Sequence, residues 1–364
     1  MGRIVGRVVP KIGILLLAAL LASGIHAQES GDIPEPQSSA MMPLANEALL
    51  LDVTRIDEKI GAVGDFGIVL TSTDDGETWQ QSQVPTRSML TGVWFHDSNL
   101  GWAVGHDAVV LKTTDGGATW ELVNYQPELL LPLFDVWFAD ASTGLAVGPY
   151  GFMLKTSDGG DTWVEGTLDA EPLTETEEET EIEERTVDQD SESGGEEDEP
   201  FWEEDFSTGI DFHLNKIIEG GDGRLYVAAE AGNIYRSDDR GETWVSLPSD
   251  YTGSYFGALT LPDDDLLIFG LRGNMFRSSD GGLAWRQIKT PVETSLNEGD
   301  IMADGAIAVV GMSGTVLVSR DGGETFELVQ REDRKSMTSV LATGTGGLIL
   351  FGEGGIVRME SGDL

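Results

Sequence analysis

Cysteine is absent from the 364 residues, so the chain has neither a disulfide framework nor a cysteine for a lipid anchor. Basic residues are scarce: 22 Lys and Arg stand against 64 Asp and Glu, a formal net charge of −42 at pH 7. Such a surface repels nucleic acid and anionic lipid. Histidine is also rare, and the three beyond the N-terminal segment (His96, His106 and His213) lack metal-ligand spacing. These shortages argue against nucleic-acid binding, and we expect no metal or other cofactor.

Long apolar runs are missing outside the first residues. Three basic residues precede an apolar run over residues 12–24, which is short for a membrane span, and the segment ends in Ile25-His26-Ala27. This pattern predicts a secretory signal peptide over residues 1–27, followed by an N-terminal extension over residues 28–39. We therefore expect an exported, monomeric protein, periplasmic or secreted, that is not inserted in the membrane after cleavage.

What the chain does contain is one octet in six copies. The copies begin 41, 43, 81, 41 and 41 residues apart, and a fixed period near 40 residues is typical of propellers and solenoids. They begin at Ser72 (STDDGETW), Thr113 (TTDGGATW), Thr156 (TSDGGDTW), Ser237 (SDDRGETW), Ser278 (SSDGGLAW) and Ser319 (SRDGGETF).

The chemistry of the octet is that of a tight turn. A Ser or Thr and an Asp two residues later can bond to backbone N–H groups of their own turn, and glycine supplies positive φ. The final aromatic residue starts the next strand and locks the turn onto its neighbours. The pattern is an Asp-box and resembles the hairpins of BNR-type β-propellers. Turn chemistry explains every aspartate, so we predict a structural role, and neither a metal nor a catalytic one, for Asp74, Asp115, Asp158, Asp239, Asp280 and Asp321.

A second phrase, AVGDFGIVLTS at Ala62 and its relatives, occurs seven times and reads as a β-hairpin upstream of each box. With a strand before and a strand after, each unit has the four strands of a propeller blade. The seventh unit, residues 336–359, stops before its fourth strand, and residues 40–43 align with residues 81–85. We predict an all-β, seven-bladed propeller over residues 40–364, closed by a blade shared between the N- and C-termini.

The repeat is interrupted over residues 166–208. From Glu165 to Asp205 there are 20 acidic residues and one base, Arg185. We predict a disordered acidic insert, because so few apolar side chains cannot offset the conformational entropy of folding. It follows a fourth strand, so it should emerge on the face opposite the boxes. It is either a tolerated loop insertion, a recognition element or a Ca²⁺-responsive surface module.

Two sets of residues are candidates for partner binding. A basic residue directly precedes four boxes (Lys112, Lys155, Arg236 and Arg277). These residues could form an arc of positive charge, but pairing with neighbouring acids on the polar face of the strand is the favoured interpretation. The hairpin tips between second and third strands differ from blade to blade, and variable tips on a constant scaffold are common recognition sites. The tips include Phe66, His106, Tyr150 and Arg272.

The combined unit, AVG-x-x-G-x-(I/V/M)-L-(K/R)-T-x-D-G-G-x-T-W, resembles the repeat of the Ycf48/Hcf136 family, photosystem II assembly factors of cyanobacteria and chloroplasts. The resemblance is closest at Ala103–Trp120 and Ala146–Trp163. It implies a non-catalytic, seven-bladed protein that binds assembling membrane-protein subunits, here on the periplasmic side. Similar exported proteins in non-photosynthetic bacteria occur beside membrane transporters, so a transporter is the other partner implied. The family's arginine patch cannot be equated with the four basic residues before the boxes.

The alternative is a carbohydrate-active or polysaccharide-binding propeller, since Asp-boxes also occur in sialidases and other glycoside hydrolases. A sialidase needs a Tyr–Glu pair and an arginine triad. The expected Arg-Ile-Pro signature is absent, and the nearest segment, Arg55-Ile56-Asp57, lacks the proline. The sequence therefore favours a binding protein that is not an enzyme.

Overall fold

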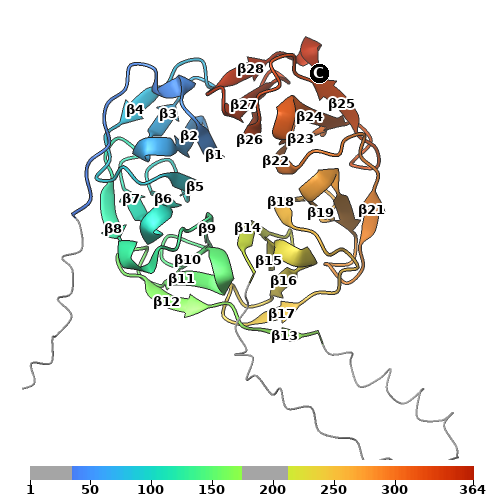
Figure 1. Ribbon diagram of the computed structural model, residues 1–364, viewed down its shortest axis with the longest axis horizontal. Helices are drawn as coiled ribbons and strands as arrows, with labels where there is room; N and C mark the ends of the chain where they lie inside the picture. The colour runs from blue at the N-terminus through green and yellow to red at the C-terminus, as the bar shows by residue number, and fades with distance from the viewer. Residues whose placement is uncertain (1–34, 174–211) are drawn as a thin grey trace, which may run out of the picture. The chain divides into compact units, whose positions relative to one another are not determined.

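The computed structural model describes residues 35–173 and 212–364, which form seven β-sheets arranged as blades around a central channel (Figure 1). The predicted seven-bladed, all-β propeller is confirmed. The predicted signal peptide and most of the acidic insert lie outside the described residues. Within the described part of the chain, no helix is long and apolar enough to cross a membrane.

In each blade the strands follow one another in chain order from the channel outward, as strands a, b, c and d. Blade one has β1 (Leu50–Ile56), β2 (Lys59–Gly64), β3 (Val69–Ser72) and β4 (Gln80–Ser82); blade two has β5 (Leu90–Phe95), β6 (Gly101–Gly105), β7 (Val110–Thr113) and β8 (Glu121–Asn124); and blade three has β9 (Asp135–Phe138), β10 (Gly144–Val147), β11 (Phe152–Thr156) and β12 (Val164–Thr167). Blade four has β14 (Leu214–Glu219), β15 (Leu225–Ala229), β16 (Ile234–Ser237) and β17 (Trp244–Ser246), and blade five has β18 (Tyr255–Thr260), β19 (Leu266–Gly270), β20 (Met275–Ser278) and β21 (Arg286–Ile288). Blade six has β22 (Leu296–Ile301), β23 (Ile307–Gly311), β24 (Thr315–Ser319) and β25 (Glu327–Gln330), and blade seven has β26 (Met337–Ala342), β27 (Leu348–Gly352) and β28 (Val357–Met359).

Short 3₁₀ turns complete the described fold. Six of them join strands b and c of successive blades: η2 (Asp65–Gly67), η3 (His106–Ala108), η5 (Pro149–Gly151), η6 (Glu230–Gly232), η7 (Leu271–Gly273) and η8 (Met312–Gly314). The others are η1 (Ala45–Glu47), η4 (Pro127–Leu129) and η9 (Ser361–Asp363). Because the strands are antiparallel, the b–c turns and the blade-to-blade connections share one face of the ring, called the b–c face below. The boxes and the a–b turns share the other, the box face.

The hydrophobic core lies between neighbouring blades. Strand b of each blade is almost entirely buried, as its continuous apolar sequence requires for a strand covered on both sides. Between the second and third blades, the Trp102 ring stacks on Phe138 at a centroid distance of 3.4 Å, and the Trp163 ring of the third box packs edge-on against Phe138. The Trp79 ring of the first box packs edge-on against Phe351 of blade seven, so this box aromatic links adjacent blades.

The closure of the ring differs from the prediction. The seventh sheet contains only β26, β27 and β28 in the described part of the chain, and residues 39–42 lie along the outer strand of the first blade instead. There the Ser39 N–H donates to the Val84 carbonyl at 2.8 Å, and the Gln81 and Gln83 amides donate to the Ala40 and Ser39 carbonyls. These side chains of the first blade give the segment hydrogen-bond partners, which explains its position.

Contacts between blade seven and blade one close the ring in place of a shared strand. The Thr338 hydroxyl donates to the Leu50 carbonyl at 2.6 Å, and the Ile356 N–H donates to the Asn46 carbonyl at 2.9 Å. The apolar side chains of the two blades form one buried cluster, which includes Phe351. The termini therefore meet through packing and single hydrogen bonds.

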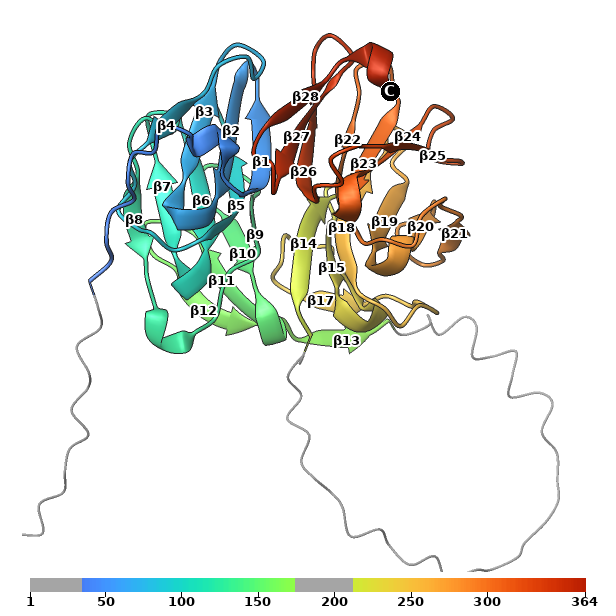
Figure 2. The same cartoon turned by 45° about the horizontal axis from the view of Figure 1, so that its top comes forward.

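The residues at the start of the predicted insert are part of the fold. Residues 166–167 complete β12, and β13 (Ala170–Pro172) pairs in parallel with β17 as a fifth strand of the fourth sheet (Figure 2). The Leu168 side chain is buried between blades three and four. The Gly151 N–H of turn η5 donates to the Phe212 carbonyl, so the chain re-enters the fold on the b–c face, as expected.

Candidate functional site

The Asp-boxes are self-contained hydrogen-bonded turns. In the second box the Thr113 hydroxyl donates to Asp115 Oδ1 at 2.9 Å, and the Gly117 N–H donates to Thr113 Oγ1 at 2.9 Å. The Thr119 N–H and hydroxyl donate to the two Asp115 oxygens at 2.8 and 2.6 Å. The same bonds recur at Asp74, Asp158, Asp239 and Asp321, whereas at Asp280 the hydroxyl partner is missing because Ala284 replaces Thr.

These bonds determine the charge of the box aspartates. Hydrogen bonds from the hydroxyls of Thr78, Thr162 and Thr325 lower the pKa of the matching carboxyls to about 2, at Asp74, Asp158 and Asp321. In the described part of the chain no group of His, Asp or Glu side chains is arranged to hold a metal ion. The box hydrogen bonds are those of a closed turn, and the structural role of the six aspartates stays a prediction.

The four basic residues before the boxes each reach the box of the next blade. Lys112 Nζ lies 2.5 Å from Asp161, Lys155 donates to the Gly241 carbonyl, and Arg236 donates to the Gly281 carbonyl at 3.4 Å. Arg277 donates to the Gly322 carbonyl at 2.7 Å and pairs with Asp263, Asp265 and Glu324. All four lie on the box face, where they link neighbouring blades and where a nearby acid offsets the charge of each. A role in partner binding stays a prediction.

We expect substitution of Arg277 by Met to lower the free energy of unfolding by about 2 kcal/mol. The substitution removes a buried guanidinium that links two blades, and the acceptors of its hydrogen bonds are then left unpaired. Its side chain is only 11% exposed. Arg286→Met is the matched control, since Arg286 pairs with the same Glu324 but is 55% exposed, and we expect a loss of less than about 0.5 kcal/mol there. Urea titration measures both; equal losses would contradict the assigned role.

Each 3₁₀ b–c turn has two successive residues in left-handed backbone conformation, the second being glycine except at Ala108, and the first residue is the tip. The tips are Phe66, Asp107, Tyr150, Ala231, Arg272 and Ser313, with φ between 54° and 61°. Phe66, Tyr150 and Arg272 were predicted as tips, and the Phe66 and Tyr150 side chains are 60% and 59% exposed. In the second blade the equivalent residue is Asp107, which accepts a hydrogen bond from Ser88; His106 is exposed one position earlier.

Further apolar side chains lie on the b–c face. Leu130, after turn η4, also has positive φ and is 82% exposed. Backbone bonds from Gln126 to Asp107 and from Ala108 to Leu131 place this connection beside turn η3. The His213 ring packs against both Tyr150 and Phe134, at centroid distances of 5.3 and 5.5 Å. The b–c face thus presents exposed aromatic and aliphatic side chains near both ends of the insert.

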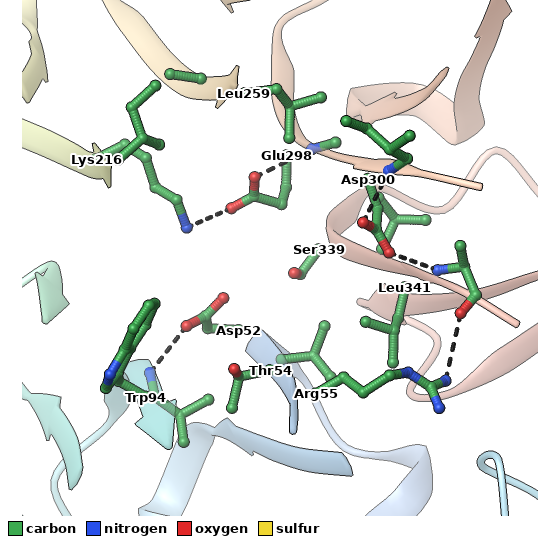
Figure 3. A pocket seen from close by; sticks show the side chains of 18 of the residues that line it. Asp52, Thr54, Arg55, Trp94, Lys216, Leu259, Glu298, Asp300, Ser339 and Leu341 are labelled. Atoms are coloured by element: carbon green, nitrogen blue, oxygen red, sulfur yellow. Dashed lines mark hydrogen bonds and ion pairs between the residues drawn. The ribbon is translucent and has the colours of Figure 1, made fainter. Parts of the chain in front are cut away.

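The second candidate site is the central channel, which contains a cavity of about 680 Å³ (Figure 3). Strand a of every blade contributes one residue to the channel wall at the same level. In each blade this residue pairs with the strand b residue, a valine, alanine or phenylalanine, that stands just before the small residue at the end of strand b. We call these residues the inner ring: Asp52, Gly92, Asp135, Lys216, Gly257, Glu298 and Ser339.

The inner ring holds three carboxylates and one ammonium group. Lys216 Nζ lies 2.7 Å from Glu298 Oε2 and 3.8 Å from Asp135 Oδ2. Asp52 Oδ2 accepts the Val93 N–H at 2.8 Å, and Asp135 Oδ2 accepts the Ile217 N–H at 2.9 Å, so both aspartates also bridge to the next blade. These bonds fix the inner ring in place.

Burial dominates the titration of this ring. It raises the pKa of Asp52 to about 7 and also raises the pKa of Glu298, in both cases against the opposing attraction of Lys216. Burial disfavours the Lys216 ammonium, but the charges of Asp135, Glu298 and Asp52 outweigh it and raise the pKa of Lys216 well above its ordinary value. Lys216 is therefore charged at every physiological pH, whereas Asp52 titrates near neutrality.

The cavity does not have the lining of a sialidase. Among the described residues that line it, Arg55 is the one arginine and tyrosine is absent, and Arg55 is paired with Asp75 at 2.7 Å. An arginine triad facing a Tyr–Glu pair is therefore missing from the described cavity, which disfavours the predicted alternative of a sialidase-like enzyme.

Sequence reasoning missed the inner ring. The signal that could have found it is the recurrence of a charged residue two positions after the buried leucine at the start of strand a, in Leu50-Leu51-Asp52, Leu133-Phe134-Asp135, Leu214-Asn215-Lys216 and Leu296-Asn297-Glu298. Aligned by repeat, these segments place charges at one level of the channel.

Fold and site together define a seven-bladed Asp-box propeller with a charged channel and an apolar b–c face. The family model described as photosynthesis system II assembly factor YCF48 matches residues 34–132. Over those residues the chain is similar to this family, and the resemblance predicted from the repeat is confirmed. No curated protein matches the chain in sequence.

Solved structures share the fold at low sequence identity. YCF48 bound to a D1 peptide and YCF48 from Cyanidioschyzon merolae are each 16% identical to this chain, with a TM-score of 0.62; they cover 90% of it, and the matches span 96% and 99% of those chains. An ancestral GH74 enzyme is 12% identical, with a TM-score of 0.62 over 90% of this chain and 46% of its own. At these identities the similarity to solved structures establishes the propeller and carries no activity.

Proposed function

We propose that this protein is a non-catalytic, exported propeller that binds a subunit of a membrane protein complex during its assembly, on the periplasmic side and as a monomer. The match to the YCF48 family model supports an assembly role, and a YCF48 structure contains a bound D1 peptide. The predicted signal peptide supports export. The partner of this chain is then a membrane-protein segment exposed outside the cytoplasm.

The observation that carries the proposal is the set of exposed apolar side chains on the b–c face. Phe66, Tyr150 and Leu130 are each more than half exposed, and each has left-handed backbone. A bulky residue in that conformation costs about 1 kcal/mol or more, and an exposed apolar side chain gains little from folding. Their contribution is therefore better explained by contact with a partner, since aromatic side chains dominate protein interfaces.

The test compares surfaces of similar polarity on the two faces. We expect the mature protein to capture a defined membrane-protein complex from host membranes, and Phe66→Ser/Leu130→Ser/Tyr150→Ser to capture it about tenfold less, because interface aromatics each carry more than about 1 kcal/mol. The control is Val164→Ser/Leu283→Ser, which removes exposed apolar side chains beside the boxes.

Mass spectrometry of the captured material quantifies each subunit. Loss in the b–c variant with retention in the control supports the proposal. Capture of no membrane protein by the unsubstituted protein, or equal capture by both variants, would contradict it. Thermal melting of each variant establishes that the fold is kept.

A further inference from the structure

One half of the inner ring is neutralised within the protein. Lys216, from blade four, extends past Gly257 of blade five to pair with Glu298 of blade six, and it also lies near Asp135 of blade three. Gly257 contributes no side chain to the ring, because an added Cβ would lie 2.5 Å from the Asn297 carbonyl oxygen. In blades three to six, the Lys216 ammonium group thus offsets the negative charge of Asp135 and Glu298.

The other half has no such cation. Glu298, Ser339 and Asp52 come from β22, β26 and β1, which are neighbours in the closed ring. Ser339 is 1% exposed and Asp52 is 8% exposed. Within the described chain, Ser339 Oγ and Asp52 Oδ1 make no hydrogen bond, and Figure 3 shows both side chains directed into the same open space as Glu298.

Both side chains are more than nine-tenths buried, and their free oxygen atoms face the cavity, where the polar group of a ligand could reach them. The cavity lies beside them and has the volume of a small-molecule site. Carboxylates exceed ammonium groups in the ring by three to one, so the complementary partner is a cation.

The geometry favours an organic cation over a metal ion. The described side chains form no group of three His, Asp or Glu suited to a metal. A primary ammonium group has three N–H donors. The open half offers the Asp52 carboxylate, the Ser339 hydroxyl and Glu298 Oε1, the Glu298 oxygen that is not paired with Lys216. Leu259 and Leu341 line the same cavity and give apolar walls for a short carbon chain.

We propose that the channel binds a primary amine, whose ammonium group lies among Asp52, Ser339 and Glu298 in the position opposite Lys216. The cavity lining extends from the inner ring, which lies near the b–c turns, to Ala303 and Thr343 in the a–b turns of the box face. The exposed side chains proposed for partner binding, Phe66, Leu130 and Tyr150, do not line this cavity. A free small amine and the lysine side chain of a peptide share this chemistry.

Isothermal titration calorimetry on the full mature chain tests the site. The probes are n-butylamine, 1,4-diaminobutane and the peptide amide Ala-Lys-Ala, with 1-butanol as the uncharged analogue. We expect binding of an amine probe and none of 1-butanol. Asp52→Asn should weaken the amine about tenfold to a hundredfold, since it removes a charge-assisted hydrogen bond, and Ser339→Ala should weaken it by a smaller factor.

The control variant is Glu327→Gln, which removes an exposed acid from outer strand β25 and should leave the affinity unchanged. Asp52→Asn keeps a side-chain acceptor for the Val93 N–H, so its fold should persist. Binding of the free amines assigns a small ligand, and binding of the peptide alone assigns a lysine side chain. Absence of binding by every amine, or equal affinity in Asp52→Asn, would overturn the proposal.

The pH dependence supplies a second readout. The ligand binds the carboxylate form of Asp52, whose pKa in the free protein is about 7 with Lys216, Asp135 and Glu298 facing it. Affinity should therefore rise as the pH increases from 5 to 8, with release of a proton on binding below pH 7. In Asp52→Asn this rise should disappear. Affinity that is flat with pH in the unsubstituted protein would contradict the assignment.

Discussion

Substituting Lys216 by Met is expected to lower the free energy of unfolding by about 3–5 kcal/mol at pH 8, because it leaves buried carboxylates without their cation. Lys216 contacts Glu298 and Asp135 directly, and its charge also opposes the rise in the pKa of Asp52. Methionine has similar length and fits the apolar part of the side-chain path. The loss therefore comes from electrostatics more than from packing.

The sign of the pH dependence separates the two causes. In the unsubstituted protein the raised pKa of Lys216 gives stability that is fully present below pH 10. Without Lys216 the pKa values of Asp52 and Glu298 in the folded state rise further above their unfolded values, so stability falls as the pH rises from about 4 towards 8. We expect the loss to be small at pH 5 and largest at pH 8.

Urea titrations at pH 5 and pH 8 measure the effect, with Lys289→Met as the control. Lys289 is exposed on the outer edge of blade five, and surface charges contribute less than about 1 kcal/mol. A loss that is equal at the two pH values would indicate a packing defect and contradict the ionic account. So would a loss no larger than that of the control.

The blades themselves were predictable because their determinants are local. A Ser or Thr, an Asp, a glycine and an aromatic within eight residues specify a turn, and the side-chain hydrogen bonds of Asp115 show that its aspartate is held from inside the octet. The period then counts the blades. Neither the turn nor the number of blades depends on how one blade packs against the next.

The features that the sequence left open depend on contacts between blades. The basic residues before the boxes read as a positive arc until the next blade is in place, whose Asp161 and box carbonyls engage them. The inner ring is similar, because Asp52 and Ser339 are 287 positions apart and meet only when the ring closes. Likewise, residues 40–43 align with an outer strand, but the side chains of Gln81 and Gln83 decide which edge they occupy.

The same dependence on neighbouring backbone explains the glycine that ends strand b in six blades. At Gly105 an added Cβ would lie 2.1 Å from the Met89 carbonyl oxygen and 2.8 Å from the Leu90 Cα. Its φ of −178° is extended backbone that any residue adopts, so the constraint is steric. The fourth blade has Ala229 at this position, and there φ is −135°, which turns the Cβ to a different direction. Alanine is thus tolerated only where the strand itself has rotated.

Gly105→Ala is therefore expected to lower the free energy of unfolding by about 3 kcal/mol, because the clash is with backbone that cannot move without disturbing the start of β5. The reverse change, Ala229→Gly, removes no clash and should cost only about 1 kcal/mol through backbone entropy and one lost methyl group. Urea titration at pH 7 measures both variants. If Gly105→Ala were as mild as Ala229→Gly, the strand would be free to rotate as in blade four, and close approach of the blade-to-blade connection would not be what selects glycine here.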